Sequence, residues 1–203
     1  MDPADRVEPQ GCPDDECREG GWEPLIELSR KDALTTAPSG FDKAGQTLYL
    51  LDSRGRDKAA LAALDLDSGK KEILFETERA DITGVVRHPT EKYPQAITYN
   101  YKRRAWKSVN EDFDATLKAA RQVHDGEFSI VDRTLDDKTW IIGFEQDDGP
   151  FRYYRFDADK REAEFLFTHR DELKDKPLAE MHPVVIESRD GLELVSYLTL
   201  PPW

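Results

Sequence analysis

The sequence has few of the features that point to a cofactor, a membrane or a nucleic acid. Only 2 of its 203 residues are cysteines, and no run of roughly eighteen apolar residues could form a spanning helix. Acidic residues outnumber basic ones, 42 against 29, and the net charge is −13. That charge repels phosphate, so neither nucleic acid nor an anionic membrane is expected as the main partner. The N-terminus lacks a basic region followed by an apolar core, so it does not read as a signal peptide.

The two cysteines, Cys12 and Cys17, lie in an acidic stretch with no histidine nearby, because the first histidine is His88. A zinc site needs four ligands, so we predict no metal and no other cofactor. A local disulfide and two free thiols both stay open, and we favour the thiols. Residues 1–20 are rich in Asp, Glu, Pro and Gly, which predicts a disordered acidic segment.

After this segment the chain repeats a pattern of short apolar runs. Three similar runs start at residues 46, 95 and 138, so they lie 49 and 43 residues apart. A period in the forties with about four short strands is typical of propeller blades, which cover one another's faces by stacking. We therefore predict an all-β fold: a partial β-propeller of about three four-stranded blades, with one helical insertion and a C-terminal β-hairpin.

The first and third blades follow the pattern most closely. The first is expected between about residues 33 and 76, and the third between about residues 128 and 167. Turn residues such as Asp67-Ser68-Gly69 separate the apolar runs. The runs predict strands at 46–52, 60–66, 71–75, 128–132, 139–145, 151–156 and 163–167.

The middle blade departs from this pattern. Strands are expected at 82–86 and 95–101, and a basic, aromatic run follows at 102–107, which we interpret as a solvated blade edge. Asn110 is a good helix cap, and Phe113, Leu117 and Ala120 follow at helical spacing. The spacing predicts a helix over 111–124 that covers an exposed strand edge.

The last stretch predicts a hairpin. Two apolar runs flank residues 188–191, and Asp190-Gly191 is a dipeptide favoured in type I′ turns. Alternation in the second run predicts one buried side. The residues predicted to lie on that buried side are Leu192, Leu194, Leu198 and Leu200.

The same residues resemble the segment that opens the catalytic α/β-hydrolase domain in the prolyl oligopeptidase family of serine peptidases, in its acylaminoacyl- and dipeptidyl-peptidase branch. The matching pattern is Pro183-Val184-x-Ile186-x-x-Arg189-Asp190-Gly191-Leu192-x-Leu194-x-x-Tyr197-Leu198-Thr199-Leu200-Pro201. The resemblance does not reach the disordered segment predicted at 1–20; it implies a partial propeller at 21–177 and a junction with the first hydrolase hairpin at 178–203. It implies that Arg189, Asp190, Gly191 and Tyr197 belong to the domain junction.

The resemblance also implies a function for the intact protein. In that family the propeller caps the active-site cavity and admits only short or unfolded peptides. The downstream hydrolase domain would be the partner and short peptides the substrates. The family's nucleophile needs Gly-x-Ser-x-Gly, and no serine here has glycine at both positions; Ser53 in Asp52-Ser53-Arg54-Gly55 matches only half. We therefore expect no catalytic residue in this chain, a hydrolase that continues beyond Trp203, and no activity from the chain alone.

Other polar clusters have simpler explanations. His88, His124, His169 and His182 have no metal spacing, so surface positions are expected. The acidic pairs near Asp147 and Asp157 are expected in hairpin turns, because neither has the ligand pattern of a calcium loop.

Two alternatives stay open at this stage: a stand-alone propeller for protein interaction, and a propeller that binds a sugar or peptide. An arc of three blades predicts uncovered apolar faces at both ends and self-association through them. Compartment is not determined; a cytoplasmic location is favoured, and a periplasmic one would need an upstream signal.

Overall fold

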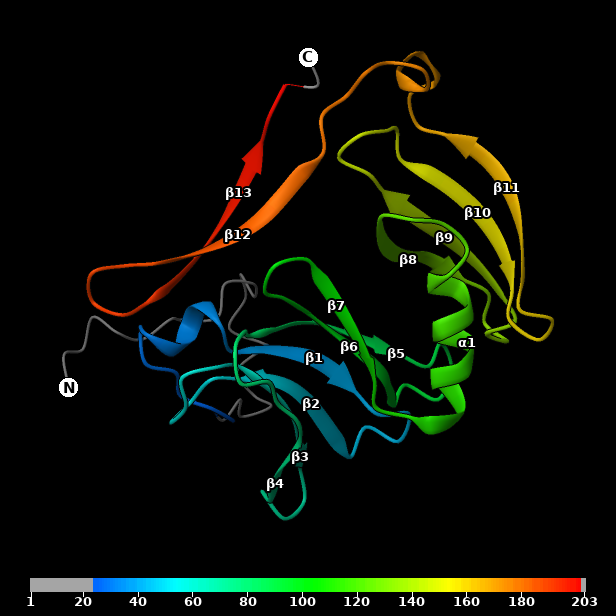
Figure 1. Cartoon of the computed structure of the whole chain (residues 1–203). Coiled ribbons are helices and arrows are strands. Elements are labelled where there is room, and N and C mark those ends of the chain that lie inside the picture. Colours follow the sequence, from blue (N-terminus) through cyan, green and yellow to red (C-terminus); the bar gives the residue numbers. More distant parts are fainter. Residues whose placement is uncertain (1–23, 202–203) are drawn as a thin grey trace, which may run out of the picture.

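The computed structural model describes residues 24–201, so the predicted disordered segment at 1–20 and its two cysteines lie outside the described residues. Figure 1 shows that the described chain is built mainly from antiparallel sheets joined by turns and loops. The first sheet has the order β1-β2-β3-β4, as predicted for a blade. A short 3-10 helix, Asp32–Leu34, precedes it. The strands of this first sheet are β1 (Ala37–Phe41), β2 (Thr47–Asp52), β3 (Ala60–Asp65) and β4 (Lys71–Phe75).

The last large sheet has the order β11-β10-β9-β8 and confirms the predicted third blade. Its β9 is buried along most of its length, because neighbouring elements cover both of its faces. The outer strand β11 is mostly exposed. The strands are β8 (Glu127–Arg133), β9 (Thr139–Glu145), β10 (Arg152–Asp157) and β11 (Glu162–Thr168), and a 3-10 helix follows at Asp171–Leu173.

The middle sheet departs from the four-stranded pattern, as expected, and has three strands: β5 (Ile82–Arg87), β6 (Pro94–Asn100) and β7 (Arg104–Ser108). The helix α1 (Glu111–Arg121) follows β7 and contacts it. The Asn110 side chain accepts a hydrogen bond from the Phe113 amide at 3.2 Å, so the predicted cap is confirmed. The helix ends three residues earlier than predicted, and the run 102–107 is mostly strand.

Packing between sheets supplies the core. Tyr49 and Leu61 of the first sheet meet Ile82 and Ile97 of the middle sheet. A larger cluster joins α1 to β6, β8, β9 and β10, and the Phe113 ring stacks on Trp140 with centroids 5.2 Å apart. All three residues predicted for the inner side of the helix are buried: Phe113, Leu117 and Ala120.

The two outer faces differ, which corrects one expectation. On the first sheet, Leu48, Leu50 and Leu64 are buried because Ile26 and Leu66 pack against them. The prediction of an uncovered face there was wrong, since the sequence gives no sign that residue 26 returns to this sheet. On the last sheet, Phe167 is 55% exposed and stacks on Tyr153.

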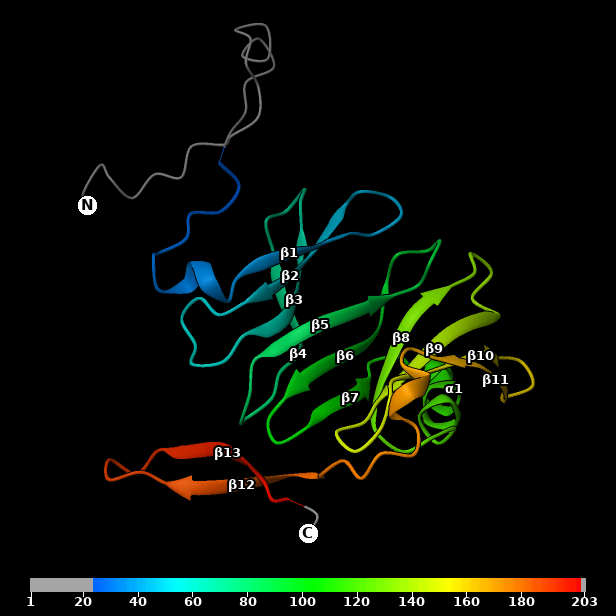
Figure 2. The same ribbon diagram turned by 90° about the horizontal axis from the view of Figure 1, so that it is seen from above.

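The hairpin pairs β12 (Met181–Glu187) with β13 (Glu193–Thr199) in an unbroken register, from Met181 with Thr199 to Glu187 with Glu193. Figure 2 shows it extending beside the sheets. Its turn spans residues 188–192, and only Gly191 within it has positive φ, +81°. The predicted type I′ turn was therefore wrong: five residues connect the strands, and Asp190 does not adopt the left-handed conformation. The chain between residues 24 and 201 holds no helix that is long and apolar enough to cross a membrane.

Candidate functional site

The hairpin is attached to the blades through the turn between β6 and β7. The Tyr197 hydroxyl donates to the Lys102 carbonyl oxygen at 2.7 Å, and the Tyr101 hydroxyl donates to the Glu193 carboxylate at 2.5 Å. These pairs are 95 and 92 residues apart in sequence. The run 102–107, predicted to be a solvated edge, thus begins with a contact surface for the hairpin.

An ion pair completes the attachment at the base of the hairpin. Arg103 Nη2 lies 2.8 Å from Asp147 Oδ2, and Asp147 belongs to the turn between β9 and β10. The same Asp147 oxygen accepts the Met181 amide at 2.7 Å, while Arg103 also donates to the Met181 carbonyl. Both backbone groups of the first β12 residue are therefore satisfied by side chains from two different sheets.

These contacts shift the pKa values of Asp147 and Arg103. Burial raises the pKa of Asp147, but the hydrogen bonds from Arg103 and the Met181 amide together outweigh it, so the net pKa is lowered. The Asp147 hydrogen bond raises the pKa of Arg103. Both side chains therefore keep their charges at neutral pH, and the contact combines an ion pair with charge-assisted hydrogen bonds.

Of the four residues predicted for the junction, the structure brings only Tyr197 to the blades. Arg189, Asp190 and Gly191 lie in the exposed turn at the far end of the hairpin. Asp190 accepts a hydrogen bond from the Ser188 hydroxyl, which lowers the pKa of its carboxyl. Sequence reasoning missed Tyr101, Arg103 and Asp147, because their partners lie many residues away and local patterns carry no sign of them.

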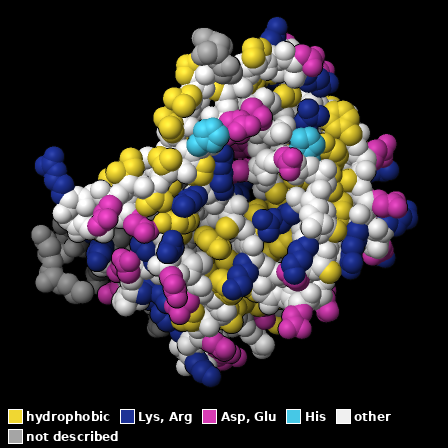
Figure 3. Space-filling model, viewed as in Figure 1, with side chains coloured by type: hydrophobic (Ala, Val, Ile, Leu, Met, Phe, Trp, Pro, Cys, Tyr) yellow, Lys and Arg dark blue, Asp and Glu magenta, His cyan; other side chains and the backbone are white. Residues whose placement is uncertain are grey.

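The side of the hairpin that faces away from the blades is apolar and open. Leu194 and Leu198 of β13 lie on this side, as expected from their spacing, but they are 49% and 45% exposed. The other two predicted leucines, Leu192 and Leu200, lie outside β13 and are exposed as well. Val184 and Ile186 of β12 lie on the same side. Figure 3 shows hydrophobic side chains gathered along the hairpin. The prediction of a buried side was therefore wrong for the described residues.

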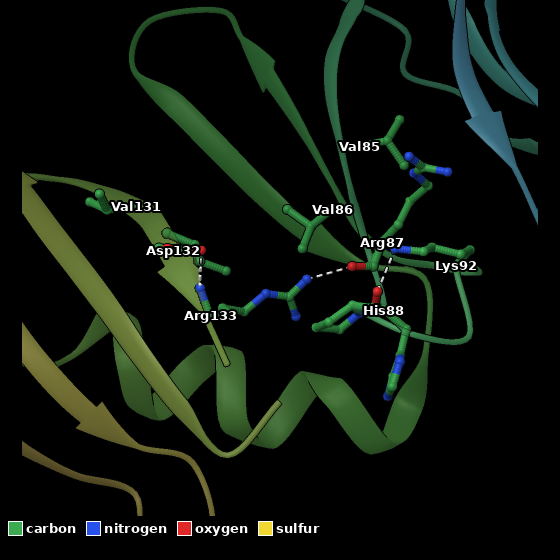
Figure 4. Close-up of a pocket in the computed structure, with 10 residues that line it drawn as sticks. Val85, Val86, Arg87, His88, Lys92, Val131, Asp132 and Arg133 are labelled. Atoms are coloured by element: carbon green, nitrogen blue, oxygen red, sulfur yellow. Dashed lines mark hydrogen bonds between the residues drawn. The ribbon is translucent and has the colours of Figure 1, made fainter. Parts of the chain in front are cut away.

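A cavity of about 370 Å³ lies between the first strands of the middle and last sheets, β5 and β8 (Figure 4). Its walls include three cationic side chains, Arg87, Lys92 and Arg133. Arg87 reaches the first sheet, where it donates to the Phe41 carbonyl at 3.1 Å.

Arg133, one of the residues that line this cavity, links the middle and last sheets. It donates to Asp137 Oδ1 at 2.8 Å and Gln95 Oε1 at 2.7 Å, and Figure 4 shows its bond to the Arg87 carbonyl. Its guanidinium lies 5.7 Å from the Trp140 ring centroid. Burial lowers the pKa of Arg133, and the Asp137 charge opposes that shift. This buried network ties the two blades together.

The half-match to a nucleophile motif has a structural role. The Ser53 hydroxyl lies 2.7 Å from the Thr35 hydroxyl and 3.0 Å from the Thr36 hydroxyl. Its neighbour Asp52 is fully buried and accepts from Arg54 and Lys71. Within residues 24–201, no three carboxylate, imidazole or thiol groups are placed to hold a metal ion together.

Stacked antiparallel sheets joined by short turns define this chain as part of a β-propeller. No family model matches the chain. Two solved prolyl peptidase structures share the fold. One is a prolyl endopeptidase (TM-score 0.52, 12% identity, covering 77% of this chain and 23% of that one). The other is prolyl oligopeptidase B from Galerina marginata (TM-score 0.53, 16% identity, 87% and 24%).

Two curated proteins are similar in sequence. Dipeptidyl aminopeptidase BIII of Pseudoxanthomonas mexicana is 43% identical over 182 residues, which is 90% of this chain and 26% of the relative. Dipeptidyl peptidase family member 6 of Caenorhabditis elegans is 30% identical over 183 residues, 89% and 25% respectively. The chain is thus related to the prolyl oligopeptidase family of serine peptidases, and it spans about a quarter of the length of these relatives.

Proposed function

We propose that this chain is the non-catalytic propeller portion of a serine peptidase that removes dipeptides from short peptides. The observation that supports this most strongly is the 43% identity to a dipeptidyl aminopeptidase across nearly all of the chain. The blades would restrict which peptides reach the active site, and the hydrolase domain would supply nucleophile, acid and base.

The hairpin is the proposed link to that domain. Its blade side is held by polar bonds from Tyr101 and Tyr197, whereas its outward side exposes Ile186, Leu194 and Leu198. Exposed contiguous apolar surface marks an interaction site, because its burial is favourable by about 25 cal/mol per Å². A hydrolase domain seated on this side would cover it, with Arg189, Asp190 and Gly191 at the edge of the junction.

A domain exchange tests the proposal. The corresponding quarter of the Pseudoxanthomonas relative would be replaced by this chain, and release of p-nitroaniline from a dipeptidyl p-nitroanilide would be measured. We expect the chimera to be active and the isolated chain to be inactive. A folded chimera without activity, or turnover by the isolated chain, would contradict the proposal.

A second substrate is needed to test whether the blades restrict access to the active site. The chimera is expected to cleave a short peptide and to leave a folded protein with the same N-terminal dipeptide intact. Cleavage of both at equal rates would remove the gating role and leave only the structural one.

A stand-alone interaction module is the second candidate. It is favoured by an aromatic row on the last sheet, in which the exposed Phe167 stacks on the half-buried Tyr153, next to Phe151. This candidate predicts a folded isolated chain that captures a protein partner through that row. Loss of capture in Phe167→Ala, with the chimera inactive, would favour it over the peptidase.

A further inference from the structure

Met181, the residue at which the chain enters the hairpin, has both of its backbone polar groups hydrogen-bonded to side chains. Met181 begins β12, thirteen residues after β11 ends at Thr168. Its amide donates to Asp147 and its carbonyl accepts from Arg103. Both contacts use the atoms of the ion pair itself, Asp147 Oδ2 and Arg103 Nη2, so the three groups close a ring of hydrogen bonds.

The two side chains come from separate sheets. Arg103 lies in the β6–β7 turn of the middle sheet, and Asp147 lies in the β9–β10 turn of the last sheet. The hairpin base is therefore fixed to two blades at once. The tyrosine contacts differ, because each is a single hydrogen bond to the β6–β7 turn alone.

We propose that Arg103 and Asp147 form a clamp on the Met181 backbone that sets the direction in which the hairpin leaves the blades. They are positioning residues, because they act on the element that follows them and not on a substrate. The clamp is a property of this chain; its consequence for catalysis rests on the proposed function.

The chemistry favours the clamp over a simple surface ion pair. Exposed pairs contribute little, but the side chain of Asp147 is only 22% exposed, and its Oδ2 accepts from a backbone amide as well as from a guanidinium. Without Asp147 the Met181 amide loses its acceptor, and without Arg103 the carbonyl loses its donor. Either loss frees the hairpin base while the blade cores stay intact.

Distance distributions between spin labels test this. Labels at Leu192→Cys on the hairpin and Lys118→Cys on α1 would be placed in a chain carrying Cys12→Ser and Cys17→Ser. Arg103→Gln and Asp147→Ala are each expected to broaden the distribution and to speed exchange of the Met181 amide by roughly tenfold. The control Lys138→Gln removes an exposed pair with Asp159 and should leave both readouts unchanged. Unchanged distributions in both variants, with unfolding midpoints as in the parent, would overturn the clamp.

A reversed pair separates the clamp from attraction between blades. Arg103→Asp with Asp147→Arg keeps opposite charges at the two positions but places an acceptor beside the carbonyl and a donor beside the amide. We expect the hairpin to stay loose in this double variant. A narrow parental distribution would show that the ion pair alone suffices and would overturn the proposal.

The active chimera gives the functional readout. There Arg103→Gln is expected to lower kcat/KM by roughly tenfold, and Arg103→Lys to restore part of the loss. If the chimera is inactive, the proposed function fails while the label distances still decide the clamp. If the chimera is active and the distances do not change, the clamp alone fails.

Discussion

The blades and the hairpin are both antiparallel sheets, yet they are stabilised in different ways. In the blades, Trp140 and Ile142 are 1% and 0% exposed because neighbouring elements cover both faces. In the hairpin every strand residue pairs in register, but Ile186 remains 52% exposed. Strand pairing is thus a local property of the sequence, whereas burial depends on what packs against the sheet.

The difference predicts that the two parts respond differently to the same kind of substitution. Blade variants should change global stability, because cooperative packing links the sheets. Hairpin variants should change local opening and leave global unfolding nearly unaltered.

The largest effect is expected from Trp140→Ala, because this buried ring packs on Phe113 and Phe156. The variant should lose about 3–5 kcal/mol of unfolding free energy, measured by urea denaturation. The matched hairpin variant Leu198→Ala should lose about 0.5 kcal/mol or less. Similar losses in both would mean that the hairpin shares the blade core.

Two glycines with positive φ, one next to the last sheet and one in the hairpin turn, give a second comparison between blades and hairpin. A Cβ at Gly126 would lie 2.5 Å from the Glu145 backbone carbonyl oxygen, whereas a Cβ at Gly191 meets no atom within 4 Å. Gly126→Ala should therefore cost about 2–3 kcal/mol, because both steric overlap and backbone strain apply. Gly191→Ala strains only the hairpin turn and should therefore change global unfolding by about 0.5 kcal/mol or less. Thermal unfolding of the two variants gives the comparison, and an equal cost would contradict it.

Asp52 is expected to make the folding stability of the blades depend on pH. Hydrogen bonds from Arg54 hold the pKa of this buried carboxyl far below its usual range, against the opposing effect of burial, and Lys71 adds to them. Since the folded pKa is depressed, the stabilisation is complete above the usual carboxyl pKa and is lost as pH falls through the folded value.

Asp52→Asn should therefore lose about 2 kcal/mol at neutral pH. The gap between parent and variant should shrink steadily as the pH is lowered below about 4. Urea midpoints across this range measure it. A gap that stays constant at all pH values would show that the charge on Asp52 contributes nothing.

The smallest effect is expected from Tyr197→Phe, which removes the hydroxyl bond to the Lys102 carbonyl. Global unfolding should shift by less than about 0.5 kcal/mol, while amides of β12 and β13 exchange several-fold faster. Tyr153→Phe, on the open face of the last sheet, is the matched control and should leave hairpin exchange unchanged. Slower or equal exchange in Tyr197→Phe would show that this contact does not hold the hairpin.

Local patterns predicted most of the fold. The helix α1 followed from the Asn110 cap and the spacing of Phe113 and Leu117, because cap and periodicity act within a few residues. The strands of the first and last sheets followed from apolar runs bounded by turn residues. The middle sheet was predicted to depart from this pattern, but its third strand, β7, was not predicted, because its basic, aromatic run was interpreted as a solvated edge.

The site was less predictable. The resemblance identified the hairpin and Tyr197, yet Arg103 and Asp147 looked like ordinary charges in turns. Their importance arises from Met181, which is 78 residues from Arg103 and 34 from Asp147. Only the folded arrangement of two blades brings these groups together, so no local pattern could indicate it.

The clamp at Met181 also has a mechanical consequence. Because the clamp bonds Met181 to both the middle and the last sheet, any sliding of one sheet past the other moves the first residue of β12. A seven-residue strand reaches about 23 Å at roughly 3.3 Å per residue, so the hairpin acts as a lever whose tip magnifies small displacements between the two sheets.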